Sequence, residues 1–326
     1  MAGDAALKSA IALAVVALLS AGCATDQING VRSAATNSDW GPGTASHDIN
    51  MDGVQRSFLL HVPAGSAGSM SDIDAPPSTS FPLVIVLHGS SGDAESIRGT
   101  SQMDSLADAR GFLVAYPNGS EGGFGLYPSD WNAGTCCGAA SREGIDDLTF
   151  ISAVIARIES TLPVDRSRIY IAGFSDGGRM AYHVACQLAP TIAAIAVVSG
   201  SLVDDECFPG SGVPVLAFHG TSDDQVAYDE NAATAVPGRV PDMAADLPSS
   251  VQFWIAENAC GDGIITRVAE HVVRTSFDPC SGADVVLYSI EGGSHGWPGE
   301  PGAGGPMSEI RASELIVEFF GRQIRR

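Results

Sequence analysis

The chain has 326 residues, 45% of them hydrophobic, which is enough for one large α/β domain with a substantial core, or for two small domains. Its 38 acidic residues outnumber its 17 lysines and arginines, and the formal net charge is −21. This charge argues against nucleic acid as a partner, because the phosphates would be repelled. A solvated acidic surface accounts for it and identifies no substrate.

The first 22 residues have the pattern of a signal peptide. Lys8 is the whole basic region, and the apolar residues 11–19 are too few for a comfortable membrane span. The run that ends in Cys23 resembles a bacterial lipobox, although the usual upstream leucine is displaced by one position. We therefore predict cleavage before Cys23, lipidation of this cysteine, and export to the cell surface or the extracellular space. Ordinary secretion and an uncleaved anchor are the alternatives. Contact with a membrane is expected only through this anchor.

Residues 23–45 are rich in small polar residues and are predicted to form a flexible tether. No repeat or composition break divides residues 46–326, which are predicted to form one domain. Apolar, β-branched runs within it predict strands at 57–63, 82–87, 111–116, 168–172, 192–198, 213–218 and 285–290. Helical patterns lie between and after them, at 146–162, 177–188 and 308–323. This alternation predicts an α/β fold with a mostly parallel, doubly wound sheet flanked by helices.

Ser175 stands at the centre of the most informative motif. An apolar strand, Gly-x-Ser-x-Gly and an amphipathic stretch follow one another there, which is the sequence form of a nucleophile elbow. Gly173 and Gly177 let the strand and the helix pass without a Cβ clash. The pattern alone is weak, but the strand before it and the helix after it favour an elbow over a glycine-rich turn.

A serine nucleophile needs a base, and the base needs an orienting acid. In a fold of this kind the expected chain order is serine, acid, histidine. Asp223 follows the strand 213–218 and is the predicted acid, with Asp224 as its local competitor. His295 follows the last strand on a glycine-rich loop and is the predicted base. The remaining histidines lie too early in the chain, inside elements, or at strand ends where backbone shaping is the commoner role.

Two backbone N–H groups are needed to hold an oxyanion. Asp176 follows the nucleophile and is expected to supply one of them. Ser90, in the glycine-rich loop after the strand 82–87, is expected to supply the other, with an ordinary turn as the alternative. The carboxylate of Asp176 is expected to disfavour anionic substrates through like-charge repulsion.

Two tryptophans and two aspartates admit a functional and a structural interpretation. Trp131 and Trp297 are candidates for lining an acyl pocket, with packing of the loops as the alternative. Asp146 and Asp147 precede a helical pattern, which favours helix capping.

Six cysteines remain after Cys23, an even number that suits an oxidising compartment. Cys260 and Cys280 flank a strand-like run at 264–273 and form the most plausible bridge. A bridge between neighbouring cysteines would be strained, which favours separate partners for the adjacent pair. The pairing of the other four is otherwise open: Cys136, Cys137, Cys186 and Cys207. No Cys-x-x-Cys or His-x-x-x-His spacing supports a metal site, and no cofactor is expected.

Together these motifs resemble the esterase family that holds polyhydroxybutyrate depolymerases, feruloyl esterases and acetylxylan esterases. The resemblance runs from about residue 46 to the C-terminus and rests on six ordered segments, 87–89, 130–138, 145–147, 173–182, 219–223 and 294–299. It implies an α/β-hydrolase fold, a Ser175–Asp223–His295 triad, ester hydrolysis through an acyl-enzyme, and a Cys260–Cys280 bridge close to the histidine loop. Ser294 and Gly296 replace the family's usual Gly and Thr, a change expected to alter the pocket and leave the base in place.

The function expected from the sequence is that of a secreted or lipid-anchored serine esterase. Its substrates would be small or oligomeric carboxylic esters of the hydroxybutyrate, feruloyl or acetyl type. Attack on solid polyester is disfavoured, because residues 46–326 leave nothing for a separate surface-binding domain. A serine peptidase on the same fold and a non-catalytic surface lipoprotein are the alternatives. The acyl group, the alcohol and the oligomeric state are left open.

Overall fold

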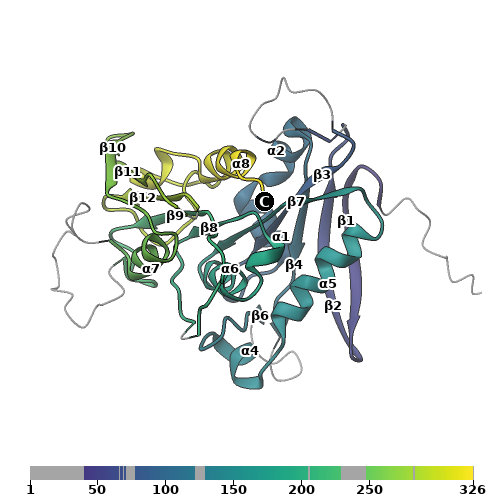
Figure 1. The fold of residues 1–326 in the computed structure, drawn as a ribbon. Helices are drawn as coiled ribbons and strands as arrows, with labels where there is room; N and C mark the ends of the chain where they lie inside the picture. Colours follow the sequence, from purple (N-terminus) through teal and green to yellow (C-terminus); the bar gives the residue numbers. More distant parts are fainter. Residues whose placement is uncertain are drawn as a thin grey trace, which may run out of the picture. The chain divides into compact units, whose positions relative to one another are not determined.

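The computed structural model describes residues 40–65, 67–68, 70, 78–121, 129–204, 206–228, 247–281 and 283–325. Most of their strands form a ten-stranded sheet in the order β1-β2-β4-β3-β7-β8-β9-β12-β11-β10 (Figure 1). In that order the strands are β1 (Gly43–Met51), β2 (Val54–Val62), β4 (Leu113–Pro117), β3 (Phe81–Leu87), β7 (Val164–Phe174), β8 (Ala194–Val198), β9 (Val215–Gly220), β12 (Val285–Ile290), β11 (Val272–Phe277) and β10 (Gly263–Arg267). A separate two-stranded ladder pairs β5 (Ser120–Glu121) with β6 (Ser129–Asp130).

The six central strands, from β4 to β12, run parallel, and an antiparallel pair flanks them on each side. The continuous apolar runs of the sequence lie in this centre, because strands covered on both faces have no polar side. Val84, Ile85 and Val86, for example, are fully buried although their side chains alternate between the two faces. The predicted parallel sheet is confirmed.

Helices cover both faces of the sheet (Figure 1). On one face, α5 (Asp147–Glu159), α6 (Asp176–Gln187) and α7 (Ser249–Glu257) pack into one hydrophobic cluster. On the other face, α1 (Ala94–Ser101), α2 (Met103–Arg110) and α8 (Ala312–Arg322) pack into a second cluster. The short elements α4 (Gly138–Glu143), η2 (Ala189–Thr191) and η4 (Gly305–Ser308) lie in the connections. The predicted helices correspond to α5, α6 and α8, whereas α1, α2 and α7 were not predicted.

The predicted C-terminal end of the tether, at residue 45, is wrong. The strand β1 already begins at Gly43, and each of its nine residues pairs with a residue of β2. Trp40 lies before it, with its ring centroid 4.0 Å from that of His47. Small and polar residues are tolerated in this strand because it lies at the edge of the sheet and is covered only in part. The predicted signal peptide and Cys23 lie outside the described residues.

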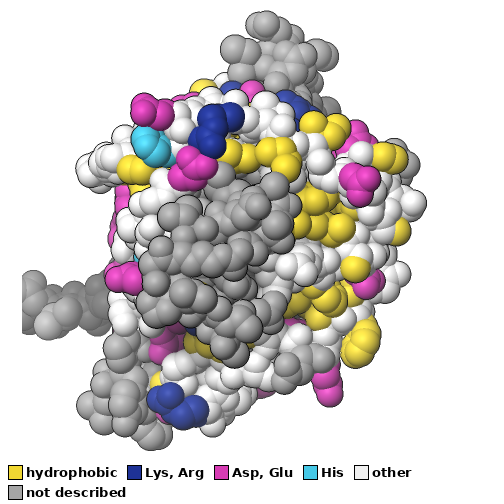
Figure 2. Space-filling view, turned by 90° about the vertical axis from the view of Figure 1, so that its left-hand side faces the viewer, with side chains coloured by type: hydrophobic (Ala, Val, Ile, Leu, Met, Phe, Trp, Pro, Cys, Tyr) yellow, Lys and Arg dark blue, Asp and Glu magenta, His cyan; other side chains and the backbone are white. Residues whose placement is uncertain are grey.

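The predicted strand-like run at 264–273 is two strands, β10 and β11, joined as an antiparallel hairpin. Figure 2 looks onto the side of the molecule that bears this hairpin and shows hydrophobic side chains on the surface there. Ile264, Ile265 and Val268 are exposed. Within the described part of the chain, every helix is too short or too polar to cross a membrane.

Three disulfides link the six cysteines in the described residues. Cys260 is bonded to Cys280, and the two residues also pair as an isolated β-bridge next to the β10–β11 hairpin. Cys186 on α6 is bonded to Cys207 in the connection after β8. The adjacent pair is bonded to itself (Cys136 and Cys137), which contradicts the expectation that each would find a partner elsewhere. Because the other four described cysteines are bonded to one another, the adjacent pair has no other described cysteine with which to pair.

Candidate active site

Ser175 lies on the single-residue turn between β7 and α6. Its backbone angles are φ 54° and ψ −117°, a conformation that a residue with a side chain rarely adopts. Its N–H continues the pairing of β7 with β8, because it donates to the carbonyl oxygen of Val198 at 2.9 Å. A Cβ on Gly173 would overlap the carbonyl of Gly177, and a Cβ on Gly177 would overlap the carbonyl of Leu87. Both glycines are therefore required, and the serine side chain stays partly accessible at the top of the sheet.

Asp223 and His295 meet at the same edge of the sheet. They follow β9 and β12, which are parallel neighbours, so both loops leave the sheet at its carboxyl end. The Nδ1 of His295 donates to the two carboxylate oxygens of Asp223, at 2.9 and 3.0 Å. With that proton on Nδ1, the neutral ring has its Nε2 lone pair available as a base. Asp224 is exposed and lies outside this contact.

The Asp223 carboxylate is fully buried yet remains the charged form. Burial alone would raise its pKa, but hydrogen bonds from His295 and from the backbone N–H groups of Val226 and Gln225 outweigh it, and the pKa is lowered. His219 supports the same loop from below, because its Nε2 donates to the carbonyl oxygen of Val226 at 2.8 Å. His219 is one of the strand-end histidines expected to shape the backbone, and this contact is of that kind.

The serine turn lies beside the histidine. The ring of Phe174, the residue before Ser175, has its centroid 5.0 Å from that of His295. Burial raises the pKa of Asp176, the residue after Ser175, and a positive charge on His295 would act to lower it. A hydrogen bond between the Ser175 hydroxyl and His295 is not among those that the described residues form. In enzymes without substrate such bonds are often long and shorten when substrate binds.

The loop that carries Ser90 passes directly over the serine turn. A Cβ on Gly89 would lie 3.2 Å from the Cβ of Ser175. Among the described residues, neither the backbone N–H of Ser90 nor that of Asp176 has a hydrogen-bond acceptor. Unpaired N–H groups beside a nucleophile are the donors that an oxyanion requires.

Asp130 and His88 hold this loop; neither was assigned a catalytic role from the sequence, and strand-end histidines such as His88 were expected to shape the backbone. Asp130, which is buried on β6, accepts a hydrogen bond from the Ser90 hydroxyl at 2.7 Å. His88 donates from Nδ1 to the carbonyl oxygen of Gly89 at 2.7 Å, and its Nε2 accepts from the N–H of Gly119 at 2.9 Å. Burial lowers the pKa of His88 against the opposing hydrogen bond, which favours the neutral ring that can accept at Nε2. His88 directly precedes Gly89, which was the available sequence signal, whereas Asp130 lies 40 residues from Ser90 and its contact with the loop left no local signal.

The carboxylate of Asp176 is paired with a cation. Arg179, one turn along α6, donates from Nη1 to Oδ1 of Asp176 at 2.7 Å. Burial raises the pKa of Asp176, and the arginine opposes this. The expected repulsion of anionic substrates by Asp176 is therefore offset by Arg179. The spacing of three residues on a helix was the sequence signal for this pair.

Neither tryptophan lines an open pocket. Trp131 is fully buried, and its indole N–H donates to the carbonyl oxygen of His88 at 2.9 Å. Trp297 is 1% exposed and donates to the hydroxyl of Ser313 at 3.0 Å. Because these rings have almost no accessible surface, they pack the loops of the site and offer no face to an acyl group. Phe174 is only partly buried and is the aromatic ring that lies beside the histidine.

Three comparisons identify relatives of the chain. Residues 70–251, more than half of it, match the family model "Esterase PHB depolymerase". Feruloyl esterase B of Piromyces equi is 31% identical over 252 residues, which are 74% of this chain and 42% of that protein. The putative esterase NocK of Nocardia uniformis is 28% identical over 274 residues, which are 78% of this chain and 74% of that protein. The chain thus spans less than half the length of the Piromyces relative.

Among solved structures, the acetyl xylan esterase from Aspergillus awamori superimposes with a TM-score of 0.57. The match covers 84% of this chain and 98% of that chain at 13% sequence identity, so it bears on the fold alone. The predicted fold class and the predicted family are both confirmed. The chain belongs to the esterase PHB depolymerase family and has the α/β-hydrolase fold.

Proposed function

We propose that this chain is a serine esterase that hydrolyses carboxylic esters through an acyl-enzyme. The observation that carries the proposal is the bond between His295 and Asp223 beside the Ser175 turn. An acid held against a histidine, next to a serine in a strained and partly accessible turn, is the arrangement that activates a hydroxyl.

In the proposed reaction, Ser175 Oγ attacks the ester carbonyl while Nε2 of His295 takes the hydroxyl proton. Asp223 keeps the ring oriented and stabilises its positive charge. The N–H groups of Ser90 and Asp176 hold the oxyanion. The imidazolium returns its proton to the departing alcohol, and a water molecule activated by the same histidine then releases the acid and restores the serine.

The acyl group that we propose is of the feruloyl, acetyl or hydroxybutyrate type. The support is the family membership and the name of the Piromyces relative, feruloyl esterase B. Phe174 offers an aromatic face beside the histidine, which suits a planar acyl group. Since Arg179 balances the charge of Asp176, this pair places no net charge beside an uncharged ester.

We further propose that the mature protein is exported and carries a lipid on Cys23. Three disulfides are typical of an oxidising compartment. Growth with a palmitate analogue tests the anchor: we expect label on the wild type and none on Cys23→Ala. Absence of label on the wild type would contradict the anchor and leave the esterase proposal untouched.

The activity is tested with p-nitrophenyl acyl esters, methyl ferulate, acetylated xylan, hydroxybutyrate oligomers and matched amides. We expect ester hydrolysis that is lost in Ser175→Ala and His295→Ala and kept in His271→Ala, which changes a partly exposed histidine paired with Glu309. Preference for the amides would instead identify a peptidase. Ester hydrolysis that survives in Ser175→Ala would contradict the proposal.

A further inference from the structure

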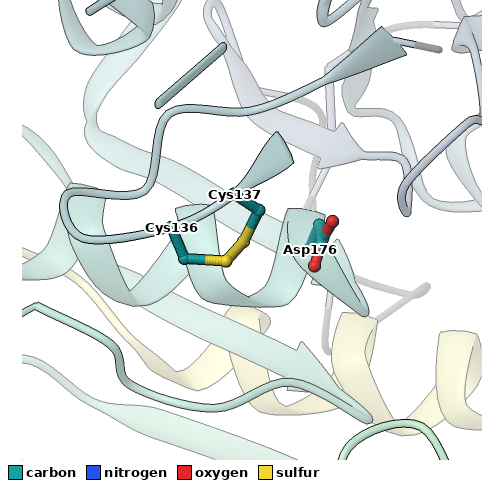
Figure 3. Close-up of side chains that lie close together, drawn as sticks. All are labelled: Cys136, Cys137 and Asp176. Atoms are coloured by element: carbon teal, nitrogen blue, oxygen red, sulfur yellow. A yellow bond between two sulfur atoms is a disulfide. The ribbon is translucent and has the colours of Figure 1, made fainter. Parts of the chain in front are cut away.

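The Cys136–Cys137 disulfide lies beside Asp176, the first residue of α6 (Figure 3). Its two sulfur atoms and a carboxylate oxygen of Asp176 all lie within 4.8 Å of one another. Asp176 directly follows Ser175, and its backbone N–H is one of the two donors proposed for the oxyanion. The disulfide therefore lies beside the residue that directly follows the proposed nucleophile.

Arg179 connects the disulfide to Asp176. Its Nη1 donates to Asp176 at 2.7 Å and lies 3.4 and 3.5 Å from the sulfur atoms of Cys136 and Cys137. Its Nε donates to the hydroxyl of Ser201 at 3.2 Å. A disulfide is a weak hydrogen-bond acceptor with little affinity for water. It therefore shields the guanidinium from water without competing with Asp176 for the N–H groups of Arg179. An ion pair covered in this way is stronger than one in water.

The disulfide is held from its other side by the loop that shapes the Ser90 donor. The N–H of Cys137 donates to the carbonyl oxygen of Trp131 at 2.9 Å. The indole of Trp131 in turn donates to the carbonyl oxygen of His88, two residues before Ser90. The neighbouring Asn132 N–H donates to Asp147, which is buried and paired with Arg56. A chain of contacts thus joins both proposed oxyanion donors through the disulfide.

We propose that the Cys136–Cys137 disulfide positions the oxyanion donor of Asp176 through Arg179, and that reduction of the disulfide by a dithiol lowers kcat. This inference rests on the proposed esterase function. Cys136, Cys137 and Arg179 are positioning residues in this account, since they act on the turn and not on the substrate.

The reduction is a thiol–disulfide exchange. A thiolate of the dithiol attacks one sulfur and breaks the Cys136–Cys137 bond, and its second thiol displaces that cysteine from the mixed disulfide. The dithiol becomes a cyclic disulfide, and two electrons and two protons pass to the cysteines, which become thiols. The two sulfur atoms can no longer stay at a bonding distance of about 2 Å. The cover over Arg179 opens, water reaches the ion pair, and the Asp176 turn is held less firmly.

The experiment compares the wild type with two double variants, C136S/C137S and C186S/C207S. The second is a matched control, because Cys186–Cys207 ties the opposite end of the same helix. For each protein, kcat and KM for p-nitrophenyl acetate are measured with and without dithiothreitol. The inhibition constant of an alkyl boronic acid, whose serine adduct places a hydroxyl in the oxyanion site, is measured in parallel.

We expect kcat to fall about 10-fold or more in C136S/C137S, up to the limit of about 10²–10³-fold that complete loss of one donor would cost. KM should change less than about twofold, and boronate affinity should fall with kcat, as a loss confined to the transition state requires. Dithiothreitol should lower kcat of the wild type and of C186S/C207S and have no effect on C136S/C137S.

A second variant keeps the test decisive if C136S/C137S fails to fold. Arg179→Met removes the connection and leaves all three disulfides, so its kcat should be low and insensitive to dithiothreitol. An unchanged kcat in C136S/C137S, or equal sensitivity of Arg179→Met and the wild type to dithiothreitol, would overturn the inference. Ester hydrolysis that survives Ser175→Ala would instead overturn the proposed function itself.

Discussion

The imidazole of His295 and the carboxylate of Asp223 are separated by 72 residues of chain and by 2.9 Å in the structure. They meet because β9 and β12 are adjacent parallel strands whose following loops share one edge of the sheet. The carboxylate accepts two backbone N–H groups besides the histidine, so its position is fixed before any substrate arrives. This relationship gives the proposed base its orientation.

Asp223→Asn should lower kcat about 10³–10⁴-fold for p-nitrophenyl acetate, because the amide stabilises the wrong tautomer of the histidine and carries no charge. Asp224→Asn, the matched change at the exposed neighbour, should keep kcat within about twofold. Steady-state kinetics of both variants, with thermal unfolding as the folding control, check this. More than a tenth of wild-type kcat in Asp223→Asn would rule out the assigned role.

The same variant should change how stability depends on pH. The folded-state pKa of Asp223 is lowered, so its contribution is present above the unfolded pKa of about 3.9 and is lost as pH falls through the folded value. The difference in free energy of unfolding between the wild type and Asp223→Asn should therefore be largest above about pH 4 and shrink below it. Urea unfolding from pH 7 to pH 3 measures it. A difference that stays constant with pH would contradict the charged, hydrogen-bonded state of Asp223.

Gly173→Ala should abolish most of the activity and destabilise the fold by about 1–3 kcal/mol, because the added Cβ overlaps the carbonyl of Gly177 and forces the turn apart. Gly99→Ala is the control, since a Cβ there meets no neighbouring atom and α1 should gain about 0.5–1 kcal/mol. Urea unfolding and kcat of both variants decide the point. Wild-type activity in Gly173→Ala would contradict the close approach of Gly173 to the carbonyl of Gly177.

Ser90→Ala and Asp130→Ala should each lower kcat, and the double variant should lose little more than either alone. The hydroxyl and the carboxylate act through one hydrogen bond of 2.7 Å, so their effects cannot add. The coupling energy of a bond to a charged group is expected to be about 1.5–3 kcal/mol. A double-mutant cycle on kcat measures it, and fully additive losses would separate Asp130 from the Ser90 loop.

Local sequence patterns predicted the central strands and the residues of the elbow because each leaves a signature within a few positions. Continuous β-branched runs identify strands buried on both faces, and paired glycines identify a turn without room for side chains. The order of serine, acid and histidine then located Asp223 and His295, since parallel strands deliver their following loops to one edge.

Local sequence patterns could not predict contacts between segments that are distant in the chain. Asp146 and Asp147 were both assigned to helix capping, and Asp146 does accept the N–H of Thr149 at 2.8 Å. Asp147 instead pairs with Arg56 in the interior, a contact across 91 residues that no local pattern encodes. The burial of Trp131 and the bond between neighbouring cysteines have the same origin, because both depend on which loop packs against which.

The most direct test of the account is the site at which a fluorophosphonate probe bonds to the protein. Intact-mass and peptide-mapping spectrometry of the labelled wild type should find one adduct, on Ser175, and Ser175→Ala should remain unlabelled. Asp224→Asn, changed at an exposed neighbour of the site, should label at the wild-type rate. An adduct on another residue, or equal labelling of Ser175→Ala, would contradict the assignment of Ser175 as the nucleophile.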